Sequence, residues 1–255
     1  MSRPVHIAPV RAGQAGPAGT DQVVEETAVA LVYNGISHAV MMCSPTDLAD
    51  FALGFSLSEG ILADADQLYA LDVVQEPTGL RVEMDIAGAP FAQLKDRRRQ
   101  LTGRSGCGLC GVDSLEHAIR PAPAVTPFQP STQAIERALA QLPEHQIEGQ
   151  ATGASHAAAW ISADGDLQLI REDVGRHNAL DKLIGARNGY FAQGFALITS
   201  RASYEMVHKA CVAGIGALVA VSAPTSLAVD IASEAGLTLI GFARPGRYQT
   251  YGTPT

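Results

Sequence analysis

Two cysteines with C-x-x-C spacing, Cys107 and Cys110, are the residues of this 255-residue chain best suited to covalent chemistry. They lie in the segment GRSGCGLCG, whose glycines give the backbone freedom to move. A basic run surrounds them, and positive charge lowers the pKa of a nearby thiol and raises its thiolate fraction. The basic residues are Lys95, Arg97, Arg98, Arg99 and Arg104. Each of these taken singly is typical of a solvated surface, but beside a cysteine pair they favour thiols that collect a group at one place and deliver it at another.

A zinc site and a redox pair are the alternative interpretations. A structural zinc needs four ligands, and the other cysteines, Cys43 at the end of an apolar run and Cys211 within a predicted helix, are expected to be buried. A zinc deaminase needs H-x-E and P-C-x-x-C, yet no histidine here has Glu two positions later, and Gly106 precedes Cys107. A thioredoxin-like pair lies at a strand-to-helix junction of a small βαβ fold, unlike this glycine-rich segment. We therefore expect no bound metal.

Hydroxyl and arginine side chains lie at the ends of three apolar runs in the C-terminal half. These ends carry Ser200 and Arg201, then Ser222 and Thr225, then Arg244 and Arg247. The carboxyl ends of parallel strands form the ligand crevice of α/β sheets, and hydroxyls at helix N-termini beside guanidinium groups suit a phosphate. Each hydroxyl alone is better explained as a helix cap, but three such ends in succession favour a shared anion site. Neither G-x-G-x-x-G after a strand nor G-x-x-x-x-G-K-[ST] occurs, which disfavours an ordinary dinucleotide site or a P-loop.

The elements that must position these groups differ between the two halves of the chain. In the C-terminal half, apolar runs alternate with helical patterns, which predicts a parallel sheet covered by helices on both faces. In the N-terminal half, Asn34-Gly35 predicts a tight hairpin, and Pro77-Thr78-Gly79 separates two further strands. A helix is expected after the first hairpin, with Ser44 as N-cap and Pro45 as its first residue. The remaining predictions are a helix over 131–142, a hairpin around Asp164-Gly165 and a short helix that starts at Asp113.

These patterns predict an α/β protein in four parts. Residues 1–20, rich in Ala, Gly and Pro, are expected to be a disordered leader. Residues 21–120 form a smaller α+β part with hairpins that ends in the cysteine loop. Residues 121–130 contain four prolines and are expected to be a linker, and residues 131–255 form the α/β part.

Composition limits the classes of function. A net charge of −8 argues against a general nucleic-acid binder, because neutralising phosphates needs a basic surface. The chain has no apolar run of signal-peptide or membrane-spanning length, so we expect a cytoplasmic protein without membrane partners, whose thiols stay reduced.

Five motifs together resemble the FdhD family, the sulfurtransferases required for formate dehydrogenase activity. They are GRSGCGLCG, REDVGRHNALDKLIG, SRASYEMVHKA, SAPTSLAV and LTLIGFARPGR, within a resemblance that runs from about Glu25 to Tyr251. The resemblance implies a homodimer whose C-terminal part has a fold similar to cytidine deaminases, without their zinc. It implies that sulfur is taken from a cysteine desulfurase as a cysteine persulfide. It also implies transfer of this sulfur to the molybdenum cofactor, a bis(molybdopterin guanine dinucleotide) bound as substrate and not held permanently, before the cofactor enters formate dehydrogenase.

The same resemblance implies roles for individual residues. Cys107 would carry the persulfide, and Cys110 would assist it. The stretch that matches the family's guanine-dinucleotide-binding segment is Phe242, Ala243, Arg244, Pro245, Gly246 and Arg247, and family members often have a second Gly where this chain has Pro245. Asp173, Arg176 and His177 precede a predicted helix and either line the pocket or cap that helix. The alternative interpretation of the whole chain is a molybdenum-cofactor-binding chaperone that never transfers sulfur.

Overall fold

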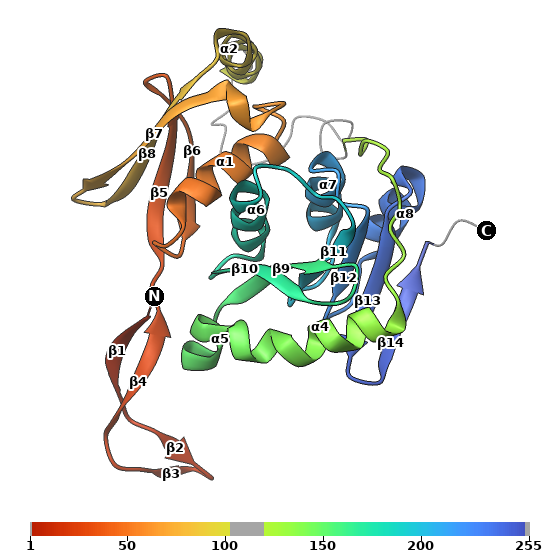
Figure 1. The fold of residues 1–255 in the computed structure, drawn as a ribbon. Helices are drawn as coiled ribbons and strands as arrows, with labels where there is room; N and C mark the ends of the chain where they lie inside the picture. Colours follow the sequence, from red (N-terminus) through yellow and green to blue (C-terminus); the bar gives the residue numbers. More distant parts are fainter. Residues whose placement is uncertain (1, 103–119, 253–255) are drawn as a thin grey trace.

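The structure, a computed structural model, describes residues 2–102 and 120–252, apart from the side chains of residues 11 and 97–102. Cys107, Cys110 and the short helix expected at Asp113 lie outside the described residues. Within these residues the chain forms two main sheets, each with helices against it (Figure 1). The predicted α/β class with a smaller N-terminal α+β part is confirmed.

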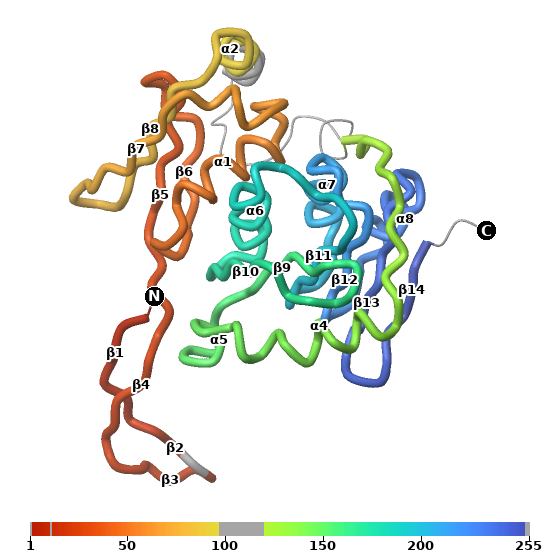
Figure 2. Tube along the Cα trace, viewed as in Figure 1, coloured from red at the N-terminus to blue at the C-terminus, as the bar shows by residue number. Residues whose placement is uncertain are grey.

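Residues 2–24 form a two-stranded arm that projects from the body of the molecule (Figures 1 and 2). Strands β1 (Ser2–Ile7) and β4 (Gly19–Val24) pair antiparallel, and the short strands β2 (Val10–Arg11) and β3 (Gln14–Ala15) form the tip. The expectation of a disordered leader is therefore wrong. Its turn, Ala12-Gly13, has φ angles of 49° and 80°, the geometry of a tight hairpin, although Ala-Gly is a weak hairpin signal in sequence.

A four-stranded sheet of order β6-β5-β8-β7 follows the arm. Both predicted hairpins are confirmed, and Asn34 and Gly35 have the positive φ angles, 46° and 80°, that their turn requires. Strands β5 and β8 are parallel, and the Asn34 side chain ties the first hairpin to the backbone of Ile86 at the end of β8. The strands are β5 (Thr27–Tyr33), β6 (Ile36–Cys43), β7 (Leu68–Glu76) and β8 (Gly79–Ile86).

Helix α1 (Leu48–Ser58) packs on the inner face of this sheet, but it does not begin where the sequence predicts. Asp47, with φ 50°, is its N-cap, and Ser44 lies outside the helix. The Ser44 hydroxyl accepts a hydrogen bond from the N–H of Val174 at 3.0 Å, and the Ser44 N–H donates to Asp173 Oδ2 at 3.0 Å. Ser44 thus joins β6 to the C-terminal half of the chain, a contact that local sequence cannot reveal.

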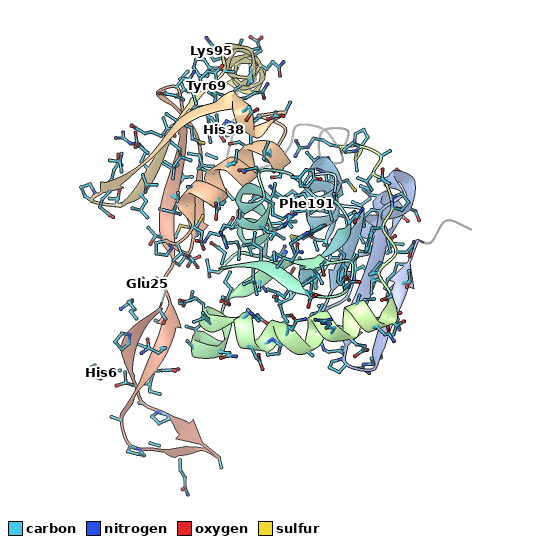
Figure 3. All side chains as sticks on the ribbon, in the orientation of Figure 1. His6, Glu25, His38, Tyr69, Lys95 and Phe191 are labelled. Carbon is cyan, nitrogen blue, oxygen red and sulfur yellow. The ribbon has the colours of Figure 1, made fainter. Side chains whose placement is uncertain are left out.

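Helix α2 (Gly88–Thr102) follows β8 and lies at the end of the N-terminal sheet remote from the arm (Figure 1). It contains the first part of the basic run. Lys95 is exposed, and its Nζ lies 4.7 Å from the centre of the Phe91 ring. Figure 3 shows Lys95 at this outer end of the molecule. A short 3₁₀ helix, η1 (Ala65–Gln67), links α1 to β7.

The C-terminal sheet has the order β10-β9-β11-β12-β13-β14. Strands β10, β11, β12 and β13 run in one direction, and β9 and β14 run in the other. The predicted parallel part consists of β11, β12 and β13, and the three other pairs of neighbouring strands are antiparallel. The hairpin predicted around Asp164-Gly165 joins β9 to β10. The strands are β9 (His156–Ser162), β10 (Leu167–Asp173), β11 (Gly194–Ile198), β12 (Ala217–Ala220), β13 (Thr238–Arg244) and β14 (Arg247–Tyr251).

Helices cover both faces of this sheet, because successive side chains of its apolar strands point to opposite faces. Trp160, Ile198 and Leu218 pack toward α6, α7 and α8, whereas Ile161 and Leu197 pack toward α4. The helices are α4 (Thr132–His145), α5 (Ile147–Thr152), α6 (Arg176–Ala186), α7 (Tyr204–Val212) and α8 (Ser226–Ala235). No helix over residues 2–102 and 120–252 has the length and apolar character needed to cross a membrane.

The two halves share one core. Buried side chains of the N-terminal sheet and α1 belong to the same apolar cluster as those of α6, α7 and α8. Helices α1 and α6 touch through their backbones at Gly54 and Gly185, where a Cβ added to Gly54 would lie 1.7 Å from Asp181 O. The proline-rich residues 121–130 have no helix or strand, and they lie along the C-terminal unit, where the N–H of Val125 donates to Ala235 O.

Candidate functional site

One edge of the C-terminal sheet gathers the ends of several strands. Because β10, β11, β12 and β13 run in the same direction, their carboxyl ends meet there, and α6, α7 and α8 begin there. Strand β9 runs the other way, so its first residue, His156, lies at the same edge and pairs with Asp173. In open α/β sheets this is the edge at which ligands bind. We refer to it as the strand-end site.

The three ends named from the sequence are joined by backbone hydrogen bonds at this edge. The N–H of Ala202 donates to Ala223 O at 3.2 Å, and the N–H of Thr225 donates to Ala202 O at 3.0 Å. On the other side, the N–H of Phe242 donates to Ser222 O at 3.0 Å. The fold therefore brings these strand ends together at one edge of the sheet, as the sequence predicted.

Two of the predicted hydroxyl groups form hydrogen bonds with nearby backbone groups. Thr225 is the N-cap of α8, and its Oγ1 accepts from the N–H of Ala228 at 3.4 Å. Ser200 is buried, and its Oγ donates to Arg201 O at 3.0 Å. The half-buried Ser222 hydroxyl and the exposed Arg201 guanidinium have no hydrogen-bond partner within the described residues. Ser222 and Arg201 are therefore the side chains left available to a ligand.

The FARPGR stretch divides between two locations. Phe242 and Ala243 lie at the strand-end site, where the Arg244 guanidinium donates to Val221 O. Phe242 has φ 52°, a left-handed conformation rare for an aromatic residue, at an irregularity between β13 and β14, and its side chain is 45% exposed. Pro245 and Gly246 turn the chain toward α4 and Arg247 begins β14; the N–H of Gly246 donates to Glu136 Oε1 at 2.9 Å.

The starts of α6 and α7 add groups that the sequence did not single out. Ser203, the N-cap of α7, makes no side-chain cap, and its buried Oγ has no partner within the described part of the chain. Glu205 Oε2 lies 2.7 Å from His177 Nε2. Burial, together with Arg176, lowers the pKa of His156 and of His177, although Glu205 opposes the shift at His177. Both rings are therefore mainly neutral at pH 7.

Sequence reasoning missed His156 and Glu205, and it left Ser203 out of the predicted site residues, for separate reasons. His156 reaches the edge only because β9 is antiparallel to its neighbours, which requires the strand order. Ser203 was expected at the start of a helix, but the absence of a cap bond from its side chain is a three-dimensional property. Glu205 follows Ser203 by two residues and gave no signal beyond a favourable charge in the first turn of a helix.

Asp173 has a structural role and does not line the site. Its side chain is fully buried, and Oδ2 lies 2.7 Å from Lys182 Nζ. Its Oδ1 accepts from the N–H of Gly175 at 2.8 Å and from the Asn178 amide at 3.0 Å, so Asp173 holds the start of α6. Of the three polar residues predicted just before α6, the other two, Arg176 and His177, are half-buried at the strand-end edge of the sheet.

Cys43 and Cys211 are buried free thiols, as predicted. Burial raises the pKa of Cys211 to about 12, and burial and Asp173 raise the pKa of Cys43 above its usual range. Neither thiol is therefore suited to nucleophilic chemistry. Over residues 2–102 and 120–252, no group of three or more His, Cys, Asp and Glu side chains is arranged to hold a metal ion.

Comparisons with known proteins agree on one family. The profile of the FdhD/NarQ family matches residues 24–255. The chain is 54% identical over 238 residues to the "Sulfur carrier protein FdhD" of Cupriavidus necator, covering 92% of this chain and 83% of that protein. It is 53% identical over 245 residues to the protein of the same name in Variovorax paradoxus, covering 93% and 88%. A crystal structure of a candidate formate dehydrogenase accessory protein from Desulfotalea psychrophila has the same fold, with TM-score 0.75 and 24% identity over 100% of this chain and 98% of that one.

Proposed function

Because the chain belongs to the FdhD/NarQ family, we propose that it is a sulfurtransferase that carries sulfur as a cysteine persulfide and passes it to a molybdenum cofactor. The donor is a cysteine desulfurase, and the acceptor is the bis(molybdopterin guanine dinucleotide) cofactor destined for formate dehydrogenase. The protein acts in the cytoplasm as a homodimer. The observation that carries this proposal is the 54% identity to a sulfur carrier protein over 92% of the chain.

Cys107 accepts the sulfur. Its thiolate attacks the outer sulfur of the donor's persulfide, a new S–S bond forms on Cys107, and the donor cysteine leaves as a thiolate. The basic residues on and after α2 favour the attacking thiolate. Cys43 and Cys211 are poor rivals, because burial raises their thiol pKa values. Cys110 assists the transfer.

The strand-end site binds the cofactor as substrate. Free hydroxyl and guanidinium groups at Ser222, Ser203 and Arg201, beside the N-termini of α7 and α8, suit the phosphates of a dinucleotide. The exposed ring of Phe242 offers a face on which a guanine base can stack. The backbone of Ala243, Arg244, Pro245, Gly246 and Arg247 and the capping residues Ser200 and Thr225 shape this site.

Intact mass spectrometry tests the proposal. After incubation with cysteine and a cysteine desulfurase, the wild-type chain is expected to gain about 32 Da, the mass of one sulfur atom. Cys107→Ala is expected to abolish this gain, and Cys110→Ala serves as the matched control at the neighbouring thiol. Absence of sulfur loading on the wild-type chain by an active desulfurase would overturn the proposal.

A cofactor-binding chaperone without sulfur transfer is the second candidate. It is favoured by the fact that the residues of the strand-end site all lie within residues 156–251, a range that does not contain the cysteine segment. In that case, formate dehydrogenase activity in cells that carry Cys107→Ala would match that of wild-type cells. Under the sulfurtransferase proposal, Cys107→Ala retains cofactor binding and loses this activity.

A further inference from the structure

The arm of residues 2–24 is a folded element without a core of its own. Strands β1 and β4 pair over six pairs of residues, and α5 contacts both strands, yet none of the described side chains of the arm is buried. Val10, at the tip, is 67% exposed. A two-stranded ribbon is at best marginally stable in water, because it buries too little apolar surface to offset the entropy of ordering its backbone. The arm therefore needs a further surface to pack against.

A second uncovered surface lies on the N-terminal sheet. Leu31 of β5 points to α1 and belongs to the main core, so its neighbour Ala30 lies on the opposite face. The register places Val40 of β6 opposite Ala30, and Met42, two residues further along β6, shares this face. Val40 is 62% exposed and Met42 is 51% exposed, so no part of the described chain covers them. We call the face that carries Ala30, Val40 and Met42 the outer face.

The charges of the arm and of the outer face are opposite. Residues 2–24 contain two arginines and one aspartate, so the arm is weakly basic on a chain whose net charge is −8. On the outer face, the apolar residues of β5 and β6 are followed by exposed carboxylates on β8 and β7. They are Glu83, Asp85 and Asp72. Asp72 lies directly opposite Glu83, and like charges in that position repel. A basic partner would offset this repulsion.

We propose that the outer face receives the arm of a second copy of this chain, in a twofold dimer in which each arm packs over Val40 and Met42 of the other protomer. The inference rests on the homodimer of the proposed function and is independent of sulfur transfer. A second copy is the partner because one twofold contact, made twice, covers both of the exposed surfaces. The complementary charges of the two surfaces favour the same pairing.

The dimensions of the arm suit this contact. From its base to its tip, each strand of the ribbon extends about 30 Å, whereas a four-stranded sheet is about 20 Å wide. The arm of one protomer is therefore long enough to cross the outer face of the other. Two arms and two faces also supply the roughly 20–30 residues a side that a stable interface contains. The family profile begins at residue 24, so this contact lies largely outside the part of the chain that defines the family.

Sedimentation velocity over nanomolar to micromolar concentrations of the full chain measures the Kd of the dimer. Val10→Asp is expected to raise this Kd about tenfold, and the double variant Val40→Asp, Met42→Asp about 100-fold. Each substitution occurs twice in a twofold dimer and replaces an apolar contact with a buried carboxylate. Tyr190→Asp is the matched control, because it adds the same charge at an exposed aromatic residue between α6 and β11, and its Kd is expected to stay within about twofold of wild type. An unchanged Kd in the arm or face variant, or an equal rise in the control, would overturn the inference.

Mixing two variants tests whether the arm and the outer face that meet belong to different protomers. Val10→Lys places a cation on the arm, and Val40→Asp places a carboxylate on the outer face. The mixed dimer has one native contact and one contact between opposite charges, whereas each unmixed dimer has two contacts between a charge and a valine. The mixed dimer is therefore expected to be about tenfold tighter than either unmixed dimer. Native mass spectrometry with one variant isotopically labelled measures the three species, and a statistical mixture would contradict the proposed contact.

Cross-linking locates the contact. In the background Cys107→Ala, Cys110→Ala, the remaining cysteines are the buried Cys43 and Cys211. Val10→Cys mixed with Met42→Cys and a short bismaleimide is expected to give a covalent dimer that contains one chain of each kind. Tyr190→Cys in place of Met42→Cys is expected to give none. Cross-linking within one chain of the double variant Val10→Cys, Met42→Cys at high dilution would show that the arm folds onto its own sheet, and the inference would fail.

The outcomes separate this inference from the proposed function. A dimer whose Kd is unaffected by the arm and face variants would overturn the arm contact alone and leave the proposed homodimer in place. A wild-type chain that stays monomeric at every concentration would overturn both the arm contact and the homodimer. Sulfur loading by the desulfurase, followed by intact mass, tests sulfur transfer separately from either result.

Discussion

Lys182 of α6 and Asp173 at the end of β10 form an ion pair that solvent does not reach, with 2.7 Å between Lys182 Nζ and Asp173 Oδ2. Lys182 Nζ also donates to Ser44 O at 3.1 Å, and the N–H of Ser44 donates to Asp173 Oδ2. The pair thus joins the end of β6 to the start of α6. It holds the N-terminal half against the unit that carries the strand-end site.

Lys182→Met is expected to destabilise the protein by about 3–5 kcal/mol, because it leaves the Asp173 carboxylate buried without its counter-charge. Urea unfolding followed by circular dichroism measures the loss. Lys95→Met is the matched control, since Lys95 is exposed on α2, and its effect is expected to stay within about 0.5 kcal/mol. A Lys182→Met protein as stable as the control would show that Asp173 is protonated or hydrated when its partner is removed.

Gly54→Ala is expected to cost about 3 kcal/mol or more, because the new Cβ would lie 1.7 Å from Asp181 O and force α1 away from α6. Gly88→Ala is the matched control, since a Cβ there has no heavy atom within 4 Å and no positive φ to strain it. Thermal unfolding of the two variants provides the comparison. Equal midpoints would mean that α1 can shift without loss of packing.

The elements predicted correctly from the sequence are those that a few adjacent residues specify. Asn34-Gly35 marked its hairpin through its backbone conformation, and the apolar runs that became β11, β12 and β13 indicated a covered parallel sheet. The strand ends at Ser200, Ser222 and Arg244 were found by the rule that carboxyl ends of such strands gather at one edge, whereas Phe242 was indicated only by the family resemblance. Each of these predictions needed only a few adjacent residues.

The errors concern contacts between distant residues. Ser44 looked like a helix cap, but its partners Asp173 and Val174 lie 129 and 130 positions away. His156 joins the site because of strand order, which no local pattern encodes. The arm was taken as disordered because its polar, glycine-containing strands lack the apolar alternation of a buried strand.

Stability is expected to fall as pH falls from about 7 toward 5. Burial lowers the pKa of His156, His177 and His208 in the folded protein from an ordinary value of 6.5, so in this range the unfolded chain binds more protons than the folded one. The double variant His156→Asn, His177→Asn should flatten this dependence. Urea midpoints at pH 7, 6 and 5 test it, and a wild-type midpoint that is constant over the range would contradict the prediction.

The Glu59 carboxylate affects stability in a separate, more acidic pH range. Burial alone would raise its pKa, but Lys209 and Arg120 lower it to about 2 in the folded protein, below its ordinary value of 4.5, so the stability it contributes is present above pH 4.5 and is lost as pH falls toward 2. The histidine effect can therefore be measured without interference from this carboxylate.

Cys43 and Cys211 are expected to resist alkylation in the native protein, because burial raises the pKa of both thiols and blocks access. In the double variant Cys107→Ala, Cys110→Ala, iodoacetamide at pH 8 should add no mass to the folded chain and two carbamidomethyl groups in urea. Intact mass after a short reaction measures both. Rapid native labelling at either position would show that the core opens on that timescale.

Two substitutions of Phe242 are expected to separate its contribution to ligand binding from the strain in its backbone. Phe242→Ala and Phe242→Gly both remove the exposed ring, so both are expected to weaken binding of the probe guanosine diphosphate by about tenfold, the loss of one stacking contact. Only glycine adopts the observed φ of 52° without strain, so Phe242→Gly should be about 1 kcal/mol more stable than Phe242→Ala. Calorimetric titration gives the affinities and urea unfolding gives the stabilities. Unchanged affinity in both variants would exclude stacking on Phe242, whereas equal stabilities would show that the irregularity in β13 relaxes once the ring is gone.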